Sequence, residues 1–252
     1  MARLDTILKY TNDLLNVTQF NDYCPNGLQV QGKEDVGHVV GGVTASKALI
    51  EKAIESNADA ILVHHGYFWK GENPVITGMK HDRLKALIEA GISLIAYHLP
   101  LDAHPVYGNN AQLAKFLDFN VTGGFAKNGN IDIAQYAQLP QALSADEVSE
   151  KLEALLGRKP FHIAGSDRKI QTIGWCTGAA QNYIEEAATL GLDAFITGEA
   201  SEQTFHAAHE LGMHFYAAGH HATERYGVQA LGAHLSEYFA MEFTFVDIDN
   251  PI

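Results

Sequence analysis

Cysteine and basic residues are scarce in this sequence. Its 252 residues include two cysteines, Cys24 and Cys176, which lie far apart and outside any CxxC motif. We therefore expect neither a disulfide framework nor a thiolate metal site. Lys and Arg number 17 against 30 Asp and Glu, so the formal net charge is -13. Because a grip on a nucleic-acid backbone or an acidic membrane needs clustered cations, the composition argues against both partners.

Long apolar runs and the common catalytic motifs are also missing. No apolar run approaches the length of a membrane span. The first residues, MARLDTILKYTNDLLN, show the pattern of an amphipathic helix instead of a signal peptide, so we expect a cytoplasmic protein without a membrane partner. The chain contains no GxxxxGK[ST] phosphate loop, no GxSxG elbow and no HExxH motif.

The residues that are present describe a globular α/β chain. Hydrophobic residues make up 46% and charged residues 19% of the sequence. Short apolar strands alternate with amphipathic helices, which favours a largely parallel sheet. The strands are expected at 36–43, 59–63, 92–97 and 215–218, and the helices at 3–16, 46–56, 82–90, 110–117 and 146–156.

The second half of the sequence repeats the first. GGVTASKALIEKAIESNADAILVHHG aligns with GWCTGAAQNYIEEAATLGLDAFITGEA, and GISLIAYHLPLD aligns with GMHFYAAGHHATE. This alignment places Asp59 opposite Asp193 and indicates two internally related α/β halves. A Gly- and Asn-rich stretch at 122–130 predicts the boundary, so the expected halves are residues 1–125 and 126–252. Since no linker separates them, we expect the halves to be tightly packed.

Three polar clusters follow predicted strands. They are His64-His65-Gly66, the segment from His98 to Asp102, and the segment from His220 to Glu224. Ligands of open α/β sheets bind beyond the carboxyl ends of strands, so these clusters could converge on one site. Imidazole and carboxylate groups together suit Zn, Fe, Mn, Co or Ni.

The local pattern at two of these clusters carries further expectations. His64 and His65 should point to opposite faces of their strand, which would suit two metal ions. Pro100 disfavours helix at the preceding residue, so the segment from His98 to Asp102 is expected to be a loop.

The third cluster lies at the start of a predicted helix. There His220 and Glu224, four residues apart, could share one face. Asp102 or Glu224 could bridge two ions, because a carboxylate has two oxygens.

The remaining polar and aromatic features support less specific expectations. Tyr67-Phe68-Trp69-Lys70 could form a pocket wall in which an aromatic ring stacks a base and Lys70 neutralises a phosphate, or it could be a packed aromatic loop. The segment 26–29 is interpreted as an ordinary turn. Ordinary hydrogen-bonded roles are expected for the other histidines, namely His38, His81, His104, His162, His206, His209, His214 and His234.

Five motifs in this order resemble those of the YbgI/Nif-three-like family, whose members are often labelled GTP cyclohydrolase I type 2 homologues. The motifs are DYCPNGLQVQG, ADAILVHHGYFW, AYHLPLD, ITGEA and GHHATERYG, and the resemblance covers nearly the whole chain. It implies two intertwined α/β subdomains with a dinuclear metal site between them and a ring-shaped homohexamer. The ligands it implies are His64, His65, Asp102, His220 and Glu224, with Glu224 bridging.

These observations support three hypotheses about function. The leading one is a metal-dependent hydrolase that acts on a nucleotide or related small molecule, with two divalent ions (Fe, Zn, Mn, Ni or Co). His98 is then the candidate general acid/base or substrate contact, or else a partner that orients Asp102. Trp69 and Lys70 are the candidate substrate contacts. The alternatives are a non-catalytic metal-handling or regulatory protein and, with less support, a ring associated with nucleic acid.

Overall fold

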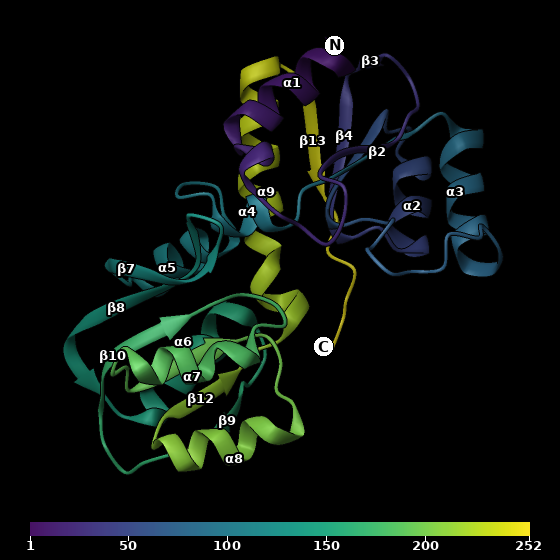
Figure 1. Cartoon of the computed structure of the whole chain (residues 1–252). Helices are drawn as coiled ribbons and strands as arrows, with labels where there is room; N and C mark the ends of the chain where they lie inside the picture. Colours follow the sequence, from purple (N-terminus) through teal and green to yellow (C-terminus); the bar gives the residue numbers. More distant parts are fainter. The chain divides into compact units, whose positions relative to one another are not determined.

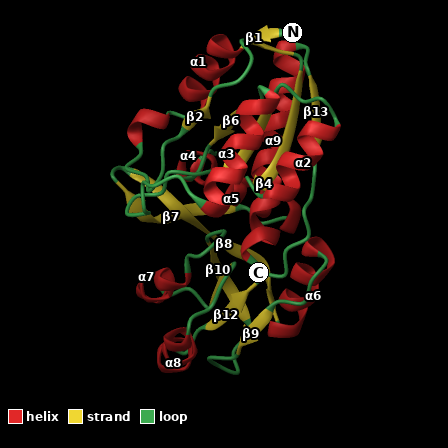
Figure 2. Ribbon diagram, turned by 90° about the vertical axis from the view of Figure 1, so that its right-hand side faces the viewer, coloured by secondary structure: helices red, strands yellow, loops and turns green.

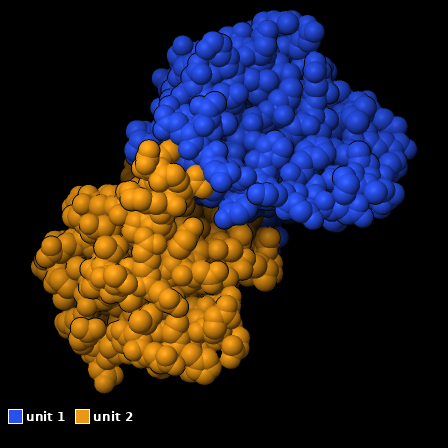
Figure 3. All heavy atoms as spheres, viewed as in Figure 1, with its two compact units in different colours: residues 1–108, 227–249 blue, residues 109–226, 250–252 orange.

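A computed structural model describes all 252 residues, which divide into two compact units. Unit 1 contains residues 1–108 and 227–249, and unit 2 contains residues 109–226 and 250–252 (Figure 3). These units differ from the expected halves because the chain returns to unit 1 near its end. The returning strand β13 (Glu242–Phe245) pairs in parallel with β4 (His38–Thr44). No helix has the length and apolar character needed to cross a membrane.

Unit 1 is a three-layer α/β/α structure. Its five-stranded sheet has the order β13-β4-β5-β6-β2, in which only β2 runs antiparallel to its neighbour. Helices α2 and α3 cover one face and α1 with the end of α9 covers the other (Figure 1). The other elements named here are α1 (Leu4–Leu14), β2 (Gly27–Val30), α2 (Lys47–Glu55), β5 (Ala60–His65), α3 (Gly78–Ala90), β6 (Ser93–Ala96), α4 (Leu99–Ala103) and α9 (His220–Phe239), with the short pair β1 (Ala2–Arg3) and β3 (Asp35–Val36) and the 3-10 turn η1 (Val17–Gln19) beside them.

Alternation along the strands builds the two cores of unit 1. Val40 of β4 packs in the core that contains α2 and α3, whereas its neighbour Val39 packs in the core that contains α1 and α9. Successive side chains of a strand point to opposite faces, so one buried strand supplies both layers. Leu49 and Ile50 of α2 are buried completely or nearly so, and the Ser46 hydroxyl caps this helix by accepting from the Leu49 N–H.

Unit 2 has a six-stranded sheet in the order β7-β8-β10-β11-β12-β9. The central strands β10, β11 and β12 are parallel, and α7 and α8 lie on the opposite side of the sheet from α6 (Figure 2). The elements are α5 (Asn109–Leu117), β7 (Val121–Asn128), β8 (Ile131–Leu143), α6 (Ala145–Leu156), β9 (Phe161–Ile163), β10 (Ile170–Trp175), η2 (Gln181–Tyr183), α7 (Ile184–Thr189), β11 (Ala194–Thr197), α8 (Glu202–Leu211) and β12 (His214–Ala217).

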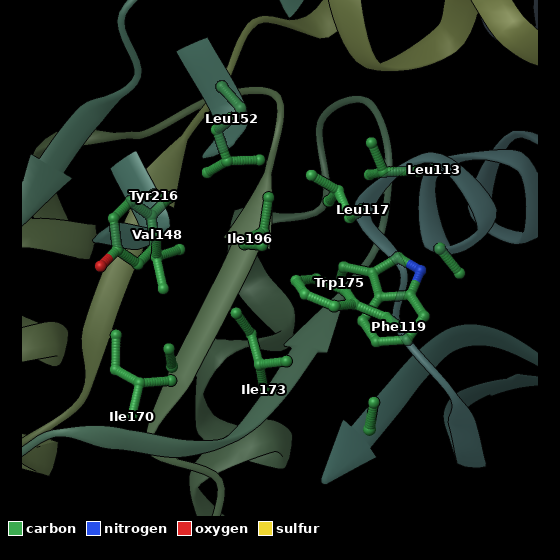
Figure 4. Packing of buried hydrophobic residues seen from close by; sticks show 14 of the residues in the cluster. Leu113, Leu117, Phe119, Val148, Leu152, Ile170, Ile173, Trp175, Ile196 and Tyr216 are labelled. Atoms are coloured by element: carbon green, nitrogen blue, oxygen red, sulfur yellow. The ribbon is translucent and has the colours of Figure 1, made fainter. Parts of the chain in front are cut away.

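The core of unit 2 centres on Trp175, at the end of β10. Its fully buried ring lies against Phe119, with ring centroids 5.4 Å apart, and near Leu113 and Leu117 (Figure 4). The indole N–H donates to the Asn110 carbonyl over 3.1 Å, so burying this ring leaves no unsatisfied donor.

The topology confirms the internal repeat. The strands β4-β5-β6-β2 of unit 1 match β10-β11-β12-β9 of unit 2 in order and direction, and α1 and α6 precede them in the two units. Asp59 and Asp193 precede β5 and β11. Each accepts two backbone N–H bonds at the start of the neighbouring strand, Asp59 from Gly37 and His38, and Asp193 from Gln171 and Thr172. The fold is therefore α/β with two internally related halves, as expected.

Three local expectations were wrong. Residues 122–130 are not a boundary segment, because most of them belong to the β7–β8 hairpin, whose turn contains Asn128-Gly129 with Gly129 at a φ of 62°. The segment 26–29 lies mostly in strand β2. The segment after His98 is the helix α4 instead of a loop, since a proline in the first helical turn loses no intrahelical hydrogen bond.

Candidate metal centre

Unit 1 gathers three imidazoles and a carboxylate at the carboxyl edge of its sheet. His64 and His65 end β5, and His98 follows β6. One ring nitrogen from each lies within 4.8 Å of those from the other two. Asp102 is buried in α4, and one of its oxygens lies 3.5 Å from His64 Nε2. The ring centroids of His64 and His65 are 4.6 Å apart, so the two rings lie side by side. The expectation that they point to opposite faces of the strand was wrong.

A hydrogen bond determines which ring nitrogen of His64 carries the proton and which faces this cluster. Its Nδ1 lies 2.9 Å from the Tyr97 carbonyl, which can only accept, so Nδ1 carries the proton. The lone pair of the neutral ring is then on Nε2, the nitrogen nearest Asp102. His65 Nδ1 lies 3.2 Å from the Thr44 hydroxyl, which can donate or accept. This arrangement of a held Nδ1 and a presented Nε2 is common among metal-binding histidines.

His98 is held by a carboxylate that the sequence analysis did not identify. Its Nδ1 donates to Asp22 over 2.7 Å, and the second oxygen of Asp22 accepts from the Leu99 N–H. Asn26 joins this hydrogen-bond network, because its side chain accepts from the His98 backbone N–H and donates to Asp22. Burial alone would raise the pKa of Asp22, but the bond from His98 and the bonds from Asn26 and a backbone N–H outweigh it and lower that pKa.

Cys24 lies beside Asp22 and His98. Its sulfur, an Asp22 oxygen and a His98 nitrogen are grouped within 4.8 Å of one another. Burial, reinforced by the charge of Asp22, raises the pKa of the Cys24 thiol to about 12. In the metal-free chain the thiol is therefore protonated at neutral pH.

Unit 2 contains its own histidine and carboxylate pair. His220 begins α9, and its Nε2 lies 3.2 Å from a Glu224 oxygen one turn later, so the two share a helix face as expected. His220 Nδ1 donates over 2.6 Å to Glu199, another carboxylate that the sequence analysis missed. Burial lowers the pKa of His220, but Glu224 and Glu199 together outweigh it and raise that pKa to about 9. Glu224 is 3% exposed.

A glycine makes room for the Glu224 carboxylate within unit 2. Gly178 follows β10 with a φ of 73°, and a Cβ at this position would collide with a Glu224 oxygen. Only glycine combines this backbone conformation with so close an approach.

The proposed substrate contacts lie beside the unit 1 cluster. The Trp69 ring stands edge-on to His98, with centroids 5.0 Å apart, and lies 6.0 Å from His65. Lys70 is exposed, and its backbone N–H donates to Tyr23, whose ring is 61% exposed. The other histidines are engaged elsewhere. For example, His234 lies between the hydroxyls of Tyr10 and Tyr107, and His214 contacts His162.

Comparison with known proteins places the chain in a family. Residues 2–251 match the family described as Duf34/NIF3 (NGG1p interacting factor 3). The chain belongs to this family. A Yersinia pestis relative named GTP cyclohydrolase 1 type 2 homolog is 52% identical over 99% of this chain and 98% of its own length. A Pseudomonas aeruginosa relative of the same name is 50% identical over 98% of each chain.

Solved structures agree with this placement. The structure of the protein ybgI is 49% identical, covers all of both chains and superposes with a TM-score of 0.95. A Thermus thermophilus protein, TTHA1606, is 33% identical over the full length of both chains, with a TM-score of 0.90. The family, the α/β fold and the presence of His, Asp and Glu clusters able to bind a metal are thus established together.

Proposed function

We propose that the protein binds two divalent metal ions and hydrolyses a nucleotide or a related small molecule. The ligands would be His64, His65 and Asp102 of unit 1 with His220 and Glu224 of unit 2. The observation that carries this proposal is the buried cluster of unit 1, in which His64 presents Nε2 toward Asp102. Buried imidazoles and carboxylates held in one orientation are typical of metal sites.

The donor set fits two ions only when both units contribute. His64, His65 and Asp102 would supply part of the ligand set, and His220 with Glu224 would supply the remaining protein ligands. Imidazole and carboxylate donors suit Fe, Zn, Mn, Ni or Co. The relatives named GTP cyclohydrolase 1 type 2 homolog support a nucleotide as the substrate class.

The chain's own residues supply the other parts of a hydrolytic site. When bound, the ions would lower the pKa of water and stabilise developing negative charge. His98, oriented by Asp22, can take up or deliver a proton at its second nitrogen beside the cluster. Trp69 can bind a flat ring next to His98, and the exposed Lys70 can approach a phosphate.

Hydrolysis assays with defined metals test this proposal. Protein loaded with each of the five metals is compared with chelated protein on nucleotides, phosphodiesters and peptides. We expect metal-dependent turnover that His64→Ala and Glu224→Ala abolish, whereas His81→Ala, at an exposed histidine, leaves it unchanged. Metal binding without any turnover would contradict the hydrolase and favour the metal-handling alternative.

We also propose that the protein works as a cytoplasmic homohexamer. Its helix α1 is built into unit 1 through buried Leu4 and Ile7, which supports a role as part of the fold. Around α3, Ile76, Met79 and Ile88 are 50%, 67% and 64% exposed, and such a patch supports self-association. Light scattering should give six times the chain mass of 27.5 kDa, and a monomer mass would contradict the assembly.

A further inference from the structure

A pocket of about 620 Å³ lies within unit 2, beside His220. Its wall contains Gly198, Glu199 and Ala200, which directly follow β11, and Ala217 at the end of β12. The edge strand β9 and the first turn of α8 complete the wall. The pocket therefore lies at the carboxyl ends of parallel strands, where open α/β sheets bind ligands, and its volume suits a small molecule.

Both side-chain carboxylates of this pocket face imidazoles, whereas its one guanidinium faces no carboxylate. Glu199 already accepts from His220, and Glu202 lies 3.3 Å from the imidazole of His206. Arg158 instead donates to a neutral acceptor, the Pro251 carbonyl, and forms no ion pair with a carboxylate. The guanidinium has five N–H donors, so it can bind an anion while it keeps this bond.

The backbone holds Arg158 in place. Gly219, the residue before His220, has a φ of 104°, and a Cβ there would lie 2.5 Å from an Arg158 terminal nitrogen. The guanidinium therefore packs directly on the backbone of this glycine. A cation fixed in this way loses less conformational entropy when an anion binds.

Two phenylalanines supply an apolar surface next to this cation. Phe161 of β9 is 60% exposed and Phe205 of α8 is 50% exposed, although both line the pocket. Beneath them Ile163 is 3% exposed. Exposed aromatic rings gain free energy when a ligand removes them from water, and they favour flat partners.

We propose that this pocket binds a small organic anion, a flat ring that carries a phosphate or carboxylate group. The anionic group pairs with Arg158 and the ring packs on Phe161 and Phe205. Because Glu199 belongs to both the pocket wall and the hydrogen bond with His220, the ligand lies next to the carboxylate that orients His220. The pocket belongs to unit 2 alone, so this proposal does not depend on metal binding or hydrolysis.

Binding is measured by ligand-observed NMR titration of the full chain after dialysis against a chelator, so that no metal holds the anion. The probes are phenyl phosphate, benzoate and inorganic phosphate. We expect saturable binding of phenyl phosphate or benzoate, tighter than that of inorganic phosphate. Arg158→Gln should weaken binding of the aromatic anion about tenfold or more, since it removes a charge-assisted hydrogen bond.

Matched variants separate the pocket from general charge effects. Arg168→Gln removes the same charge from unit 2 at a residue that also donates to a backbone carbonyl, Gly212, and should leave affinity unchanged. Phe161→Ala should reduce the preference for phenyl phosphate over inorganic phosphate. Arg158→Lys, which keeps the charge, should bind better than Arg158→Gln if both melt at the wild-type temperature. No saturable binding of either aromatic probe, or equal affinity in Arg158→Gln and Arg168→Gln, would overturn the proposal.

Discussion

Four histidines of the candidate clusters, three in unit 1 and one in unit 2, have the same kind of neighbour at one ring nitrogen. Each has Nδ1 beside an oxygen: the Tyr97 carbonyl for His64, the Thr44 hydroxyl for His65, and a carboxylate for His98 and His220. The two carboxylate-held rings occupy aligned positions of the repeat. Their carboxylates, Asp22 and Glu199, come from different places in the two halves, so the same arrangement was reached with different residues.

Glu199→Gln tests the role of this carboxylate in unit 2. The amide keeps the shape of the side chain, but it accepts a weaker hydrogen bond from His220. The imidazole is then less basic and less firmly oriented. We expect metal affinity to fall about 10- to 100-fold, the usual effect of losing such a partner. Competition with a chromophoric chelator measures it. Glu202→Gln, which changes the exposed partner of His206 instead, should leave the affinity unchanged, and equal losses in both variants would contradict this role.

Asp22→Asn tests the matching carboxylate in unit 1. The amide no longer accepts equally well from His98 Nδ1, so we expect the ring to change its tautomer and kcat to fall about 10- to 100-fold with little change in KM. The ring nitrogen chemical shifts of His98, measured by NMR, report the tautomer directly. Asp13→Asn changes an exposed carboxylate paired with Lys9 and serves as the control. Unchanged His98 shifts would contradict the orienting role.

The sequence pointed to the candidate ligands more readily than to the carboxylates that hold His98 and His220. The histidine clusters follow predicted strands, and that position is visible in the sequence. Asp22 and His98 are 76 residues apart, and Glu199 and His220 are 21 apart. Both pairs meet only through the tertiary fold, so no local pattern could identify them. Both carboxylates nevertheless belong to motifs that carried the family resemblance.

At the scale of elements, the repeat was predictable because its strands and helices keep their order. The wrong predictions concern residue types that are compatible with two different local structures. Pro100 excludes a helix interior but suits a first turn, so α4 was missed. The glycines of 122–130 suggested a boundary, yet Gly123 lies under the Tyr136 side chain of β8, which would have to move to admit a Cβ there.

The paired aspartates before β5 and β11 tie neighbouring strands together, and their removal should lower stability. Burial would raise the pKa of Asp59, but Lys33 and the N–H groups of Gly37 and His38 lower it below the ordinary 3.8. The pKa of Asp193 is lowered in the same way, chiefly by backbone N–H groups against burial. Asp59→Asn and Asp193→Asn should each lose about 1–3 kcal/mol of unfolding free energy at neutral pH.

The pH dependence of that loss has a defined sign. A lowered folded pKa contributes stability that is complete above the unfolded pKa and is lost as pH falls through the folded value. The difference between wild type and Asp59→Asn, measured by urea denaturation, should therefore be full at neutral pH and shrink below about pH 4. A difference that stays constant down to about pH 2 would contradict a carboxylate role. Asp13→Asn, at an exposed ion pair, should change stability by less than about 0.5 kcal/mol.

At the scale of the whole molecule, the chain passes between its two units at three points, between residues 108 and 109, 226 and 227, and 249 and 250. Helix α9 begins in unit 2 with His220 and ends in unit 1, and β13 then joins the sheet of unit 1 beside β4. The division into units could not be deduced from the repeat, because β13 has no counterpart in the aligned segments. Its parallel pairing with β4, more than 190 residues earlier in the chain, is decided by tertiary contacts.

If ligands from both units bind the metal together, the stability that metal adds should depend on the ligands of each unit. Free metal at 100 times its dissociation constant raises the unfolding free energy by about 2.7 kcal/mol, so a chelator should lower the melting temperature by several degrees. If the five ligands act together, His64→Ala in unit 1 and Glu224→Gln in unit 2 should each remove most of this metal-dependent shift, while His81→Ala keeps it. Differential scanning calorimetry with and without metal measures the shift. A full shift in Glu224→Gln together with a lost shift in His64→Ala would show that unit 1 binds metal alone, and the shared dinuclear centre would then be wrong.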